Sequence, residues 1–207
     1  MTDVKIRRGD LREALITHAQ EEAKAGTIEQ MSLRHAAREL GVSSGAVYRH
    51  FDDKDALLQE IVLRGMHELK AKFAAIRPKD APARSVELAL HRGRELVRTY
   101  IQFAQDNPSL WHLMFGRIGA ELKHILMCDP EEASYTAFDV CHENMLDLWR
   151  LGALKQEPSL DDVRYVWSAT HGAAELTLSH QRIDFAEIDA VCDQTSERNM
   201  RAIGFAG

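Results

Sequence analysis

The sequence predicts an all-α protein in which a small N-terminal three-helix domain is followed by a larger helical domain. Apolar residues recur at three- and four-residue spacing along most of the 207 residues, as on one face of an amphipathic helix. No stretch alternates apolar and polar residues for long enough to predict a strand. Glycine and proline interrupt the helical pattern and divide it into about nine helices.

Composition excludes several classes of protein. The content of 45% hydrophobic and 28% charged residues is ordinary for a globular protein. No apolar run is long enough to span a membrane, and the opening residues MTDVKIRRGD lack the apolar core of a signal peptide, so we expect a cytoplasmic protein. The cysteines, Cys128, Cys141 and Cys192, are odd in number and widely scattered, which argues against a disulfide framework or a zinc site.

The negative charge is unevenly distributed. The chain has a net charge of −6, yet residues 1–50 carry eight Lys or Arg against seven Asp or Glu. The acidity therefore lies in the rest of the chain. A negative overall field limits indiscriminate binding to nucleic acid and leaves any affinity to a local basic face.

The N-terminal segment predicts a bracing helix preceded by a basic arm. Lys5, Arg7 and Arg8 form either a disordered terminus or an arm that enters a minor groove, and the sequence leaves both open. The first helix is expected from about Asp10 to Ala25.

The stretch from Ser32 to Lys54 carries the most specific pattern in the chain. Ser32 is a suitable cap for a short helix that stops at Gly41, a residue that readily adopts a left-handed conformation. Ser43 or Ser44 then offers a hydroxyl to the free N–H groups of a second short helix. Two short helices around such a turn form a helix-turn-helix, whose second helix is sized for a DNA major groove.

The residues of this stretch divide between two faces. Ala37, Val42, Val47 and Phe51 are spaced to pack the helices together, and the opposite face carries donors and cations suited to phosphates and base edges. The alternative is an ordinary helical pair with a few exposed cations. The residues predicted to bind DNA are Arg34, Ser43, Ser44, Gly45, Ala46, Tyr48, Arg49, His50 and Lys54.

Three short sequences, GVS at 41–43, VYRHF at 47–51 and ALL at 56–58 after Lys54, resemble the DNA-binding signature of the TetR family of transcriptional repressors. The resemblance implies that Tyr48, His50 and Lys54 contact the DNA backbone. It places Ser44, Gly45, Ala46 and Arg49 nearest the bases, and Arg34 within reach of a base or a phosphate.

A long helix is expected from Asp53 to about Ile76, because the apolar period continues until Arg77-Pro78 stops it. The segment PKDAPA at 78–83 contains two prolines and is predicted to be a hinge. The expected domains are therefore 1–52 for DNA binding, 53–77 as a connecting helix, and 78–207 for effector binding and dimerisation.

The last two helices, about Leu160 to Gln181 and Phe185 to Ile203, are joined by few residues and are expected to be antiparallel neighbours. They either complete the core of one subunit or form a four-helix bundle with a second copy. We expect the homodimer, because one helix-turn-helix reads too few base pairs. The predicted dimerisation residues are Val163, Val166, Thr170, Ala174, Leu178, Ile188, Val191 and Thr195.

Aromatic and methionine residues in the second half are candidates for a ligand pocket, although such residues at helical spacing are more often plain core. The sequence NPSLW at 107–111 with LMF at 113–115, and Trp167 with His171-Gly172, also resemble the WHG type of TetR C-terminal domain. The predicted ligand-binding residues are Tyr100, Phe103, Trp111, Met114, Phe115, Tyr135, Phe138, His142, Trp167, His171 and Glu175.

An enzyme is not predicted. The sequence has no GxSxG, P-loop, GxGxxG or HExxH motif, and its Glu-His pairs are adjacent rather than spaced for a di-metal helical bundle. We expect no cofactor or metal. The predicted function is a ligand-responsive repressor that binds a palindromic operator as a homodimer and is released by a small hydrophobic effector. The alternative is a dimeric helical sensing module without sequence-specific DNA recognition.

Overall fold

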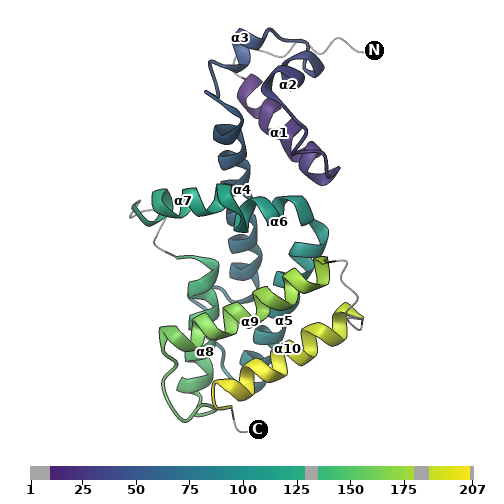
Figure 1. The fold of residues 1–207 in the computed structure, drawn as a ribbon. Coiled ribbons are helices and arrows are strands. Elements are labelled where there is room, and N and C mark those ends of the chain that lie inside the picture. The colour runs from purple at the N-terminus through teal and green to yellow at the C-terminus, as the bar shows by residue number, and fades with distance from the viewer. Residues whose placement is uncertain (1–9, 129–134, 180–186, 206–207) are drawn as a thin grey trace. The chain divides into compact units, whose positions relative to one another are not determined.

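The computed structural model describes residues 10–128, 135–179 and 187–205, which form ten α-helices and no strand beyond one isolated bridge between Leu154 and Phe205 (Figure 1). The all-α class is therefore confirmed. The basic arm at Lys5, Arg7 and Arg8 lies outside the described residues. No helix in the described parts of the chain has an apolar stretch long enough to cross a lipid bilayer.

The helices form two compact units whose limits differ from the expected domains. The first unit contains residues up to His67 together with Asn107–Cys128, and the second contains Glu68–Asp106 and the residues from Asp129 onward. Residues 107–128 thus belong with the N-terminal helices. The predicted hinge at 78–83 lies inside the second unit, so it does not join the two.

The N-terminal helices of the first unit begin and end at the residues that local chemistry favours. They are α1 (Leu11–Lys24), α2 (Leu33–Glu39) and α3 (Ser44–Val47). The Ser32 hydroxyl accepts a hydrogen bond from the His35 N–H at 3.1 Å, and a left-handed Gly41, with φ of 66°, follows α2. Ser43, not Ser44, caps α3. The sequence predicts that the second helix of the motif runs from Ser44 to His50. In the structure this helix ends at Val47, because residues 48–50 form a turn.

Helices α4 (Lys54–Ile76), α6 (Pro108–Phe115) and α7 (Arg117–Cys128) complete the first unit, to which α4 contributes its residues as far as His67. A side chain at Gly65 would come within 2.8 Å of the Met114 sulfur, so the missing Cβ lets α6 pack tightly against α4. Gly116 separates α6 from α7, although the helical pattern of the sequence continues across Gly116 towards Met127. This division accounts for ten helices in the described residues instead of nine.

Gly119 is expected to tolerate no side chain. A Cβ at Gly119 would overlap the carbonyl oxygen of Met114, which is backbone and cannot rotate away. We expect Gly119→Ala to lower the free energy of unfolding by about 1–3 kcal/mol, measured by urea denaturation. Gly45→Ala, in α3, is the matched control, because nothing lies within 4 Å of the added methyl group and alanine favours a helix. Equal stability of the two variants would contradict the clash.

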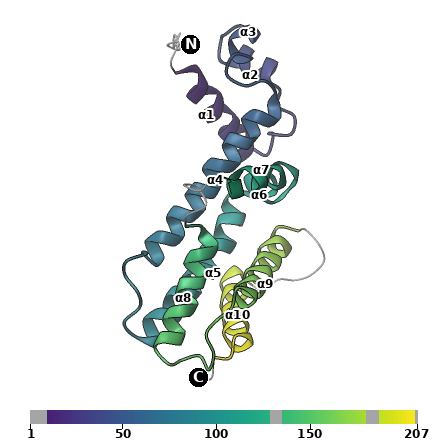
Figure 2. The same cartoon turned by 90° about the vertical axis from the view of Figure 1, so that its left-hand side faces the viewer.

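The second unit is built around α5 (Val86–Asp106), which packs against α8 (Ala137–Arg150), α9 (Leu160–Leu178) and α10 (Ile188–Ala202) (Figures 1 and 2). Capping boxes start two of these helices, Thr136 with Asp139 on α8 and Ser159 with Asp162 on α9. Helices α9 and α10 run antiparallel side by side, as their short connection predicted. The last residues of α4 also belong to this unit.

Candidate nucleic-acid interface and ligand cavity

The helix-turn-helix separates a packed face from an exposed face. Ala37, Val47 and Phe51 are buried, and Val42 is half-buried between them and solvent. These apolar contacts fix α2 and α3 against each other. The polar residues on the opposite side are therefore held on a rigid support.

All nine residues predicted to bind DNA reach the surface of the first unit. Ala46 and Lys54 are half-buried and the other seven are exposed, with Tyr48 at 43% exposure. Within the described part of the chain, Arg34, Arg49 and His50 have no ion pair or hydrogen bond to another side chain. Their donors are available for phosphate oxygens or base edges.

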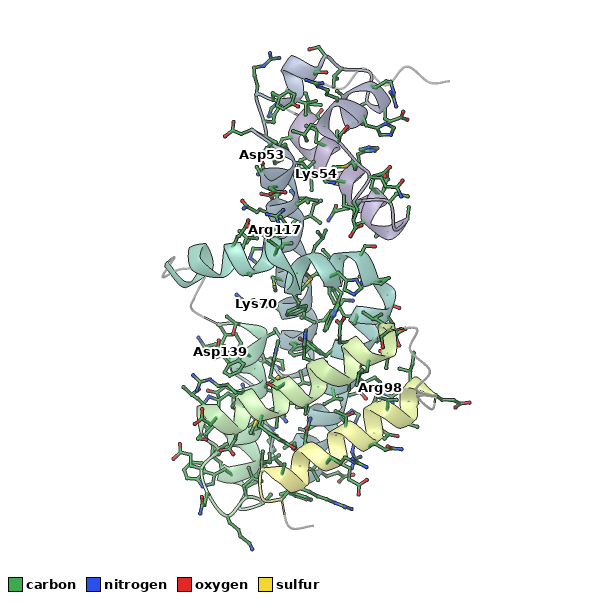
Figure 3. All side chains as sticks on the ribbon, viewed as in Figure 1. Asp53, Lys54, Lys70, Arg98, Arg117 and Asp139 are labelled. Carbon is green, nitrogen blue, oxygen red and sulfur yellow. The ribbon has the colours of Figure 1, made fainter. Side chains whose placement is uncertain are left out.

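Lys54 differs from the other cations of this face, because its ammonium already has a partner. Lys54 Nζ donates a hydrogen bond to the backbone carbonyl of Glu29 at 2.7 Å, and the neighbouring Asp53 accepts from the Ala56 N–H at 2.8 Å (Figure 3). Asp53 therefore caps α4. Lys54 has to share or exchange its contact with Glu29 when it approaches a phosphate, a feature that sequence spacing did not indicate.

Charged side chains brace α1 against α4 behind this face. Arg12 lies over the ring of Phe51 at 5.4 Å and pairs with Glu60 at 2.7 Å, while Arg64 bridges Glu60 and Glu13. The hydrogen bond from Arg12 holds the pKa of Glu60 below its usual value, although partial burial acts in the opposite direction.

We expect this network to contribute stability at neutral pH and to lose it in acid. Because the pKa of Glu60 is lower in the folded state, its contribution is complete above the ordinary value of 4.5 and disappears as the pH falls through the folded pKa. Urea unfolding of the wild type and Glu60→Gln, from about pH 7 to about pH 3, measures the difference. That difference should shrink towards acid, and a constant one would contradict the assignment.

The second unit contains a cavity of about 40 Å³, measured as space open to the centre of a water molecule. This space exceeds what a single water requires. Five helices supply the walls, with Phe73 from α4 and the remainder from α5, α8, α9 and α10. The lining residues are Phe73, Gly93, Leu96, Val97, Tyr100, Cys141, Asn144, Met145, Val166, Trp167, Thr170, Asn199 and Met200.

Two of the predicted ligand residues, Tyr100 and Trp167, line this cavity, and their rings meet edge to face at 4.9 Å. The Tyr100 hydroxyl is 3.0 Å from His171 Nδ1, and the Phe138 ring lies 5.9 Å from Trp167. His171 and Phe138 therefore contact residues that line the cavity but do not line it themselves.

The other predicted ligand residues lie elsewhere. Trp111, Met114 and Phe115 are on α6 in the first unit. Phe103 is buried in α5 without lining the cavity, His142 Nε2 lies 3.3 Å from the Pro158 carbonyl, Tyr135 stacks under Lys79, and Glu175 is exposed.

Sequence reasoning missed the polar residues of the wall. Asn144, Thr170 and Asn199 are all at least nine-tenths buried. Asn144 falls between Val140 and Leu148 at four-residue spacing, so an amide within an apolar stripe was the available signal.

The cavity wall is electrically neutral. None of its lining side chains carries a charge. Burial raises the pKa of Tyr100, and it raises the pKa of Cys141 to about 12, so both stay protonated at neutral pH. Such a wall favours an uncharged ligand over an ion, whose desolvation would not be compensated.

Comparison with known proteins places both units in one family. Residues 15–61 match the model of bacterial regulatory proteins of the tetR family, and residues 94–202 match the tetracyclin repressor-like C-terminal domain. The chain belongs to the TetR family. TetR-family regulators are DNA-binding transcriptional regulators. The C-terminal match does not test the finer resemblance to the WHG type, which stays a prediction.

The chain is also similar to one curated relative and to solved structures that share its fold. The nucleoid occlusion factor SlmA of Haemophilus ducreyi is 24% identical over 164 residues, covering 78% of this chain and 73% of that protein. A Rhodococcus sp. RHA1 protein of unknown function has a TM-score of 0.76 and 24% identity, over 98% of this chain and 100% of that one. The SmeT–triclosan complex has a TM-score of 0.65 and 15% identity, over 95% and 92%.

The TetR chain presents two different apolar faces on α9. Of the predicted dimerisation residues, Val163, Val166, Thr170 and Ala174 are buried inside their own subunit. The half-buried ones are Leu178, Ile188, Val191 and Thr195. The large apolar side chains that α9 exposes are instead Leu160, Tyr165 and Leu176, at 52%, 53% and 39% exposure.

Proposed function

We propose that this TetR-family regulator is a ligand-responsive repressor, which binds a palindromic operator as a homodimer and is released by a small hydrophobic effector. The observation that carries the proposal is that α4 contributes a residue to each of the two sites. Its first residue, Lys54, belongs to the predicted DNA-binding face, and Phe73 in its last turn lines the apolar cavity. One continuous helix thus contributes to both sites.

The proposed DNA contacts follow from exposure and charge. Tyr48, His50 and Lys54 hold phosphates and set the register of the protein, while Arg49 and Arg34 read base edges. The small residues at 44–46 allow the backbone to approach the groove closely. Two copies related by a twofold axis then occupy half-sites about one helical turn apart or slightly more.

The proposed dimer uses the exposed side of the α9–α10 pair. Tyr165 and Leu176 expose apolar area on one side of α9, and Gly172 on the same side leaves room for a second helix to approach. The buried stripe of Val163 and Ala174 is assigned to the core of each subunit. A second copy covering the exposed side would form a twofold interface.

The proposed effector acts by moving α4. A ligand that occupies the cavity presses on Phe73, and a shift of α4 changes the spacing of the two helix-turn-helix units. Coupling of about 1–3 kcal/mol is typical of such switches and is enough to change operator occupancy. The SmeT structure, which is described as a complex with triclosan, supports a small-molecule effector for this fold.

A gel-shift assay with DNA from upstream of the gene tests DNA recognition. We expect a shifted band whose intensity depends on sequence and which migrates as a dimer complex. Binding that is equal on unrelated DNA, or absent at low salt, would favour the sensing module without DNA recognition. The observation that favours this alternative is the net negative charge of the residues after position 50, which repels DNA.

Lys54→Ala is expected to weaken binding to all sequences and to lower the salt slope by about 1 per subunit, since one phosphate contact is lost. Affinity measured at several salt concentrations gives the slope. Lys70→Ala, which removes the same charge farther along α4, is the matched control (Figure 3). An unchanged slope in Lys54→Ala, or an equal change in Lys70→Ala, would exclude Lys54 from the phosphate contacts.

A further inference from the structure

One buried polar atom in the cavity wall has no partner. Asn144 is 2% exposed, and its side-chain oxygen Oδ1 lacks a hydrogen-bond donor among the described residues. Its amide nitrogen donates to the backbone carbonyl of Ala89 on α5 at 3.1 Å. This bond fixes the orientation of the amide, because a flipped side chain would bring two oxygens together. Buried acceptors without a donor are uncommon in folded proteins.

The neighbouring donors of the cavity are already used. The Thr170 hydroxyl donates to the Val166 carbonyl at 2.8 Å and accepts from the Asn199 amide at 3.1 Å. The Tyr100 hydroxyl lies 3.0 Å from His171 Nδ1. These hydroxyl and amide groups are therefore bonded elsewhere, and a molecule inside the cavity that Asn144 lines is the candidate donor for its Oδ1.

We propose that the cavity takes an uncharged, mainly apolar ligand with one hydroxyl or N–H group, which donates a hydrogen bond to Asn144 Oδ1. This inference rests on the proposed ligand response and names the chemical class of the effector. Asn144 Oδ1 favours a ligand that has a hydrogen-bond donor, because a ligand without a donor leaves this buried oxygen unsatisfied.

The other lining residues favour a flat, apolar and uncharged ligand. The rings of Phe73, Tyr100 and Trp167 offer apolar and edge contacts to a flat ligand, and Met145 and Met200 adapt to its outline. No charged side chain in the wall compensates a carboxylate. Phenol is therefore a suitable probe, and toluene is its counterpart of similar shape without a donor.

The test is a thermodynamic cycle of two ligands and two proteins. Isothermal titration calorimetry on the full chain measures each affinity. The affinities of phenol and toluene are measured for the wild type and for Asn144→Leu. Hydration of the two ligands contributes equally in both proteins, so the change in the phenol-to-toluene ratio isolates the contact with Asn144. We expect the ratio to fall about tenfold in Asn144→Leu, with toluene still bound. Val140→Ala, at a buried position of α8 that does not line the cavity, should leave the ratio unchanged.

Wild-type protein alone provides a second measurement in case Asn144→Leu does not fold. Anisole keeps the oxygen of phenol but replaces its proton with a methyl group, so we expect it to bind at least about tenfold more weakly. Equal binding of phenol and anisole, an unchanged ratio in Asn144→Leu, or binding of neither probe would overturn the proposal. Calorimetry needs no DNA. Phenol binding that never alters operator affinity would therefore refute the switch while leaving the ligand assignment intact.

Discussion

Asp147→Ala is expected to lower the free energy of unfolding by about 3–5 kcal/mol, because it removes the fully buried partner of the Arg77 cation and leaves only the half-buried Glu143, 3.1 Å from Arg77. The side chains of Arg77 and Asp147 are 1% and 0% exposed, and two hydrogen bonds of 3.0 and 3.1 Å join them. Asp147 also accepts from the Ala83 N–H at 3.0 Å. Urea denaturation at fixed protein concentration measures the loss.

Two further variants separate the buried pair from charge in general. Asp161→Ala removes an exposed carboxylate that pairs with Arg164 at 2.6 Å, and its cost should stay within about 1 kcal/mol. Replacing both partners, as Arg77→Met with Asp147→Leu, should recover much of the loss, because no uncompensated charge remains buried. A cost below about 1 kcal/mol for Asp147→Ala would contradict the expected role of Asp147 and would mean that Glu143 or water is enough to compensate the Arg77 charge.

The same pair anchors the segment at 78–83, which the sequence predicted to be a hinge. Its two prolines are typical of a linker, and the sequence does not reveal that Arg77 is buried against a residue 70 positions away. The Asp147 carboxylate holds both Arg77, at the end of α4, and Ala83, at the end of the segment. A long-range ion pair thus anchors a segment whose composition suggests freedom.

Local chemistry made the helix-turn-helix predictable. The caps at Ser32, Ser43 and Asp53 each act on an N–H three residues ahead, so the sequence contains the whole interaction. Gly41 needs only its own left-handed conformation. Ser32 and Gly41 were therefore predicted by residue, and Ser43 was one of two candidates, whereas the early end of α3 was not predicted.

The cavity was harder to predict because its wall comes from five helices that are distant in the sequence. The residues of the aromatic cluster at 111–115 were predicted to bind the ligand, yet Trp111 and Met114 are fully buried in the first unit. Asn144 was overlooked because a polar residue in an apolar stripe has no characteristic partner spacing. Residue type indicates that a side chain is buried, but packing decides which cavity it reaches.

Helix α9 shows why the dimer interface was also difficult to predict from the sequence. An apolar stripe at three- and four-residue spacing predicts a buried face without indicating what covers it. In α9 the stripe through Val163, Val166 and Ala174 is covered by its own subunit. Tyr165 and Leu176 lie outside that stripe, and they are the residues whose replacement by serine should weaken a dimer without disturbing the core.

Arg49→Ala is expected to cost about 1–3 kcal/mol at each half-site, and therefore about 2–6 kcal/mol for a dimer on its full operator. Arg49 is exposed on the helix-turn-helix and has no ion pair within the described part of the chain. Its planar guanidinium can make two hydrogen bonds to guanine, which no other base matches. Competition gel shifts on the operator and its single-base variants measure the loss at each position.

Arg38→Ala is the matched control for Arg49, because Arg38 is an exposed arginine on the preceding helix that pairs with Glu39 and with the His35 ring. Both changes remove one positive charge, so long-range attraction to DNA falls equally. A base contact predicts that only Arg49→Ala relaxes preference, and that it does so at one symmetric pair of positions. A uniform loss over all sequences in both variants would reduce Arg49 to a phosphate contact and leave Arg34 as the arginine to test for base reading.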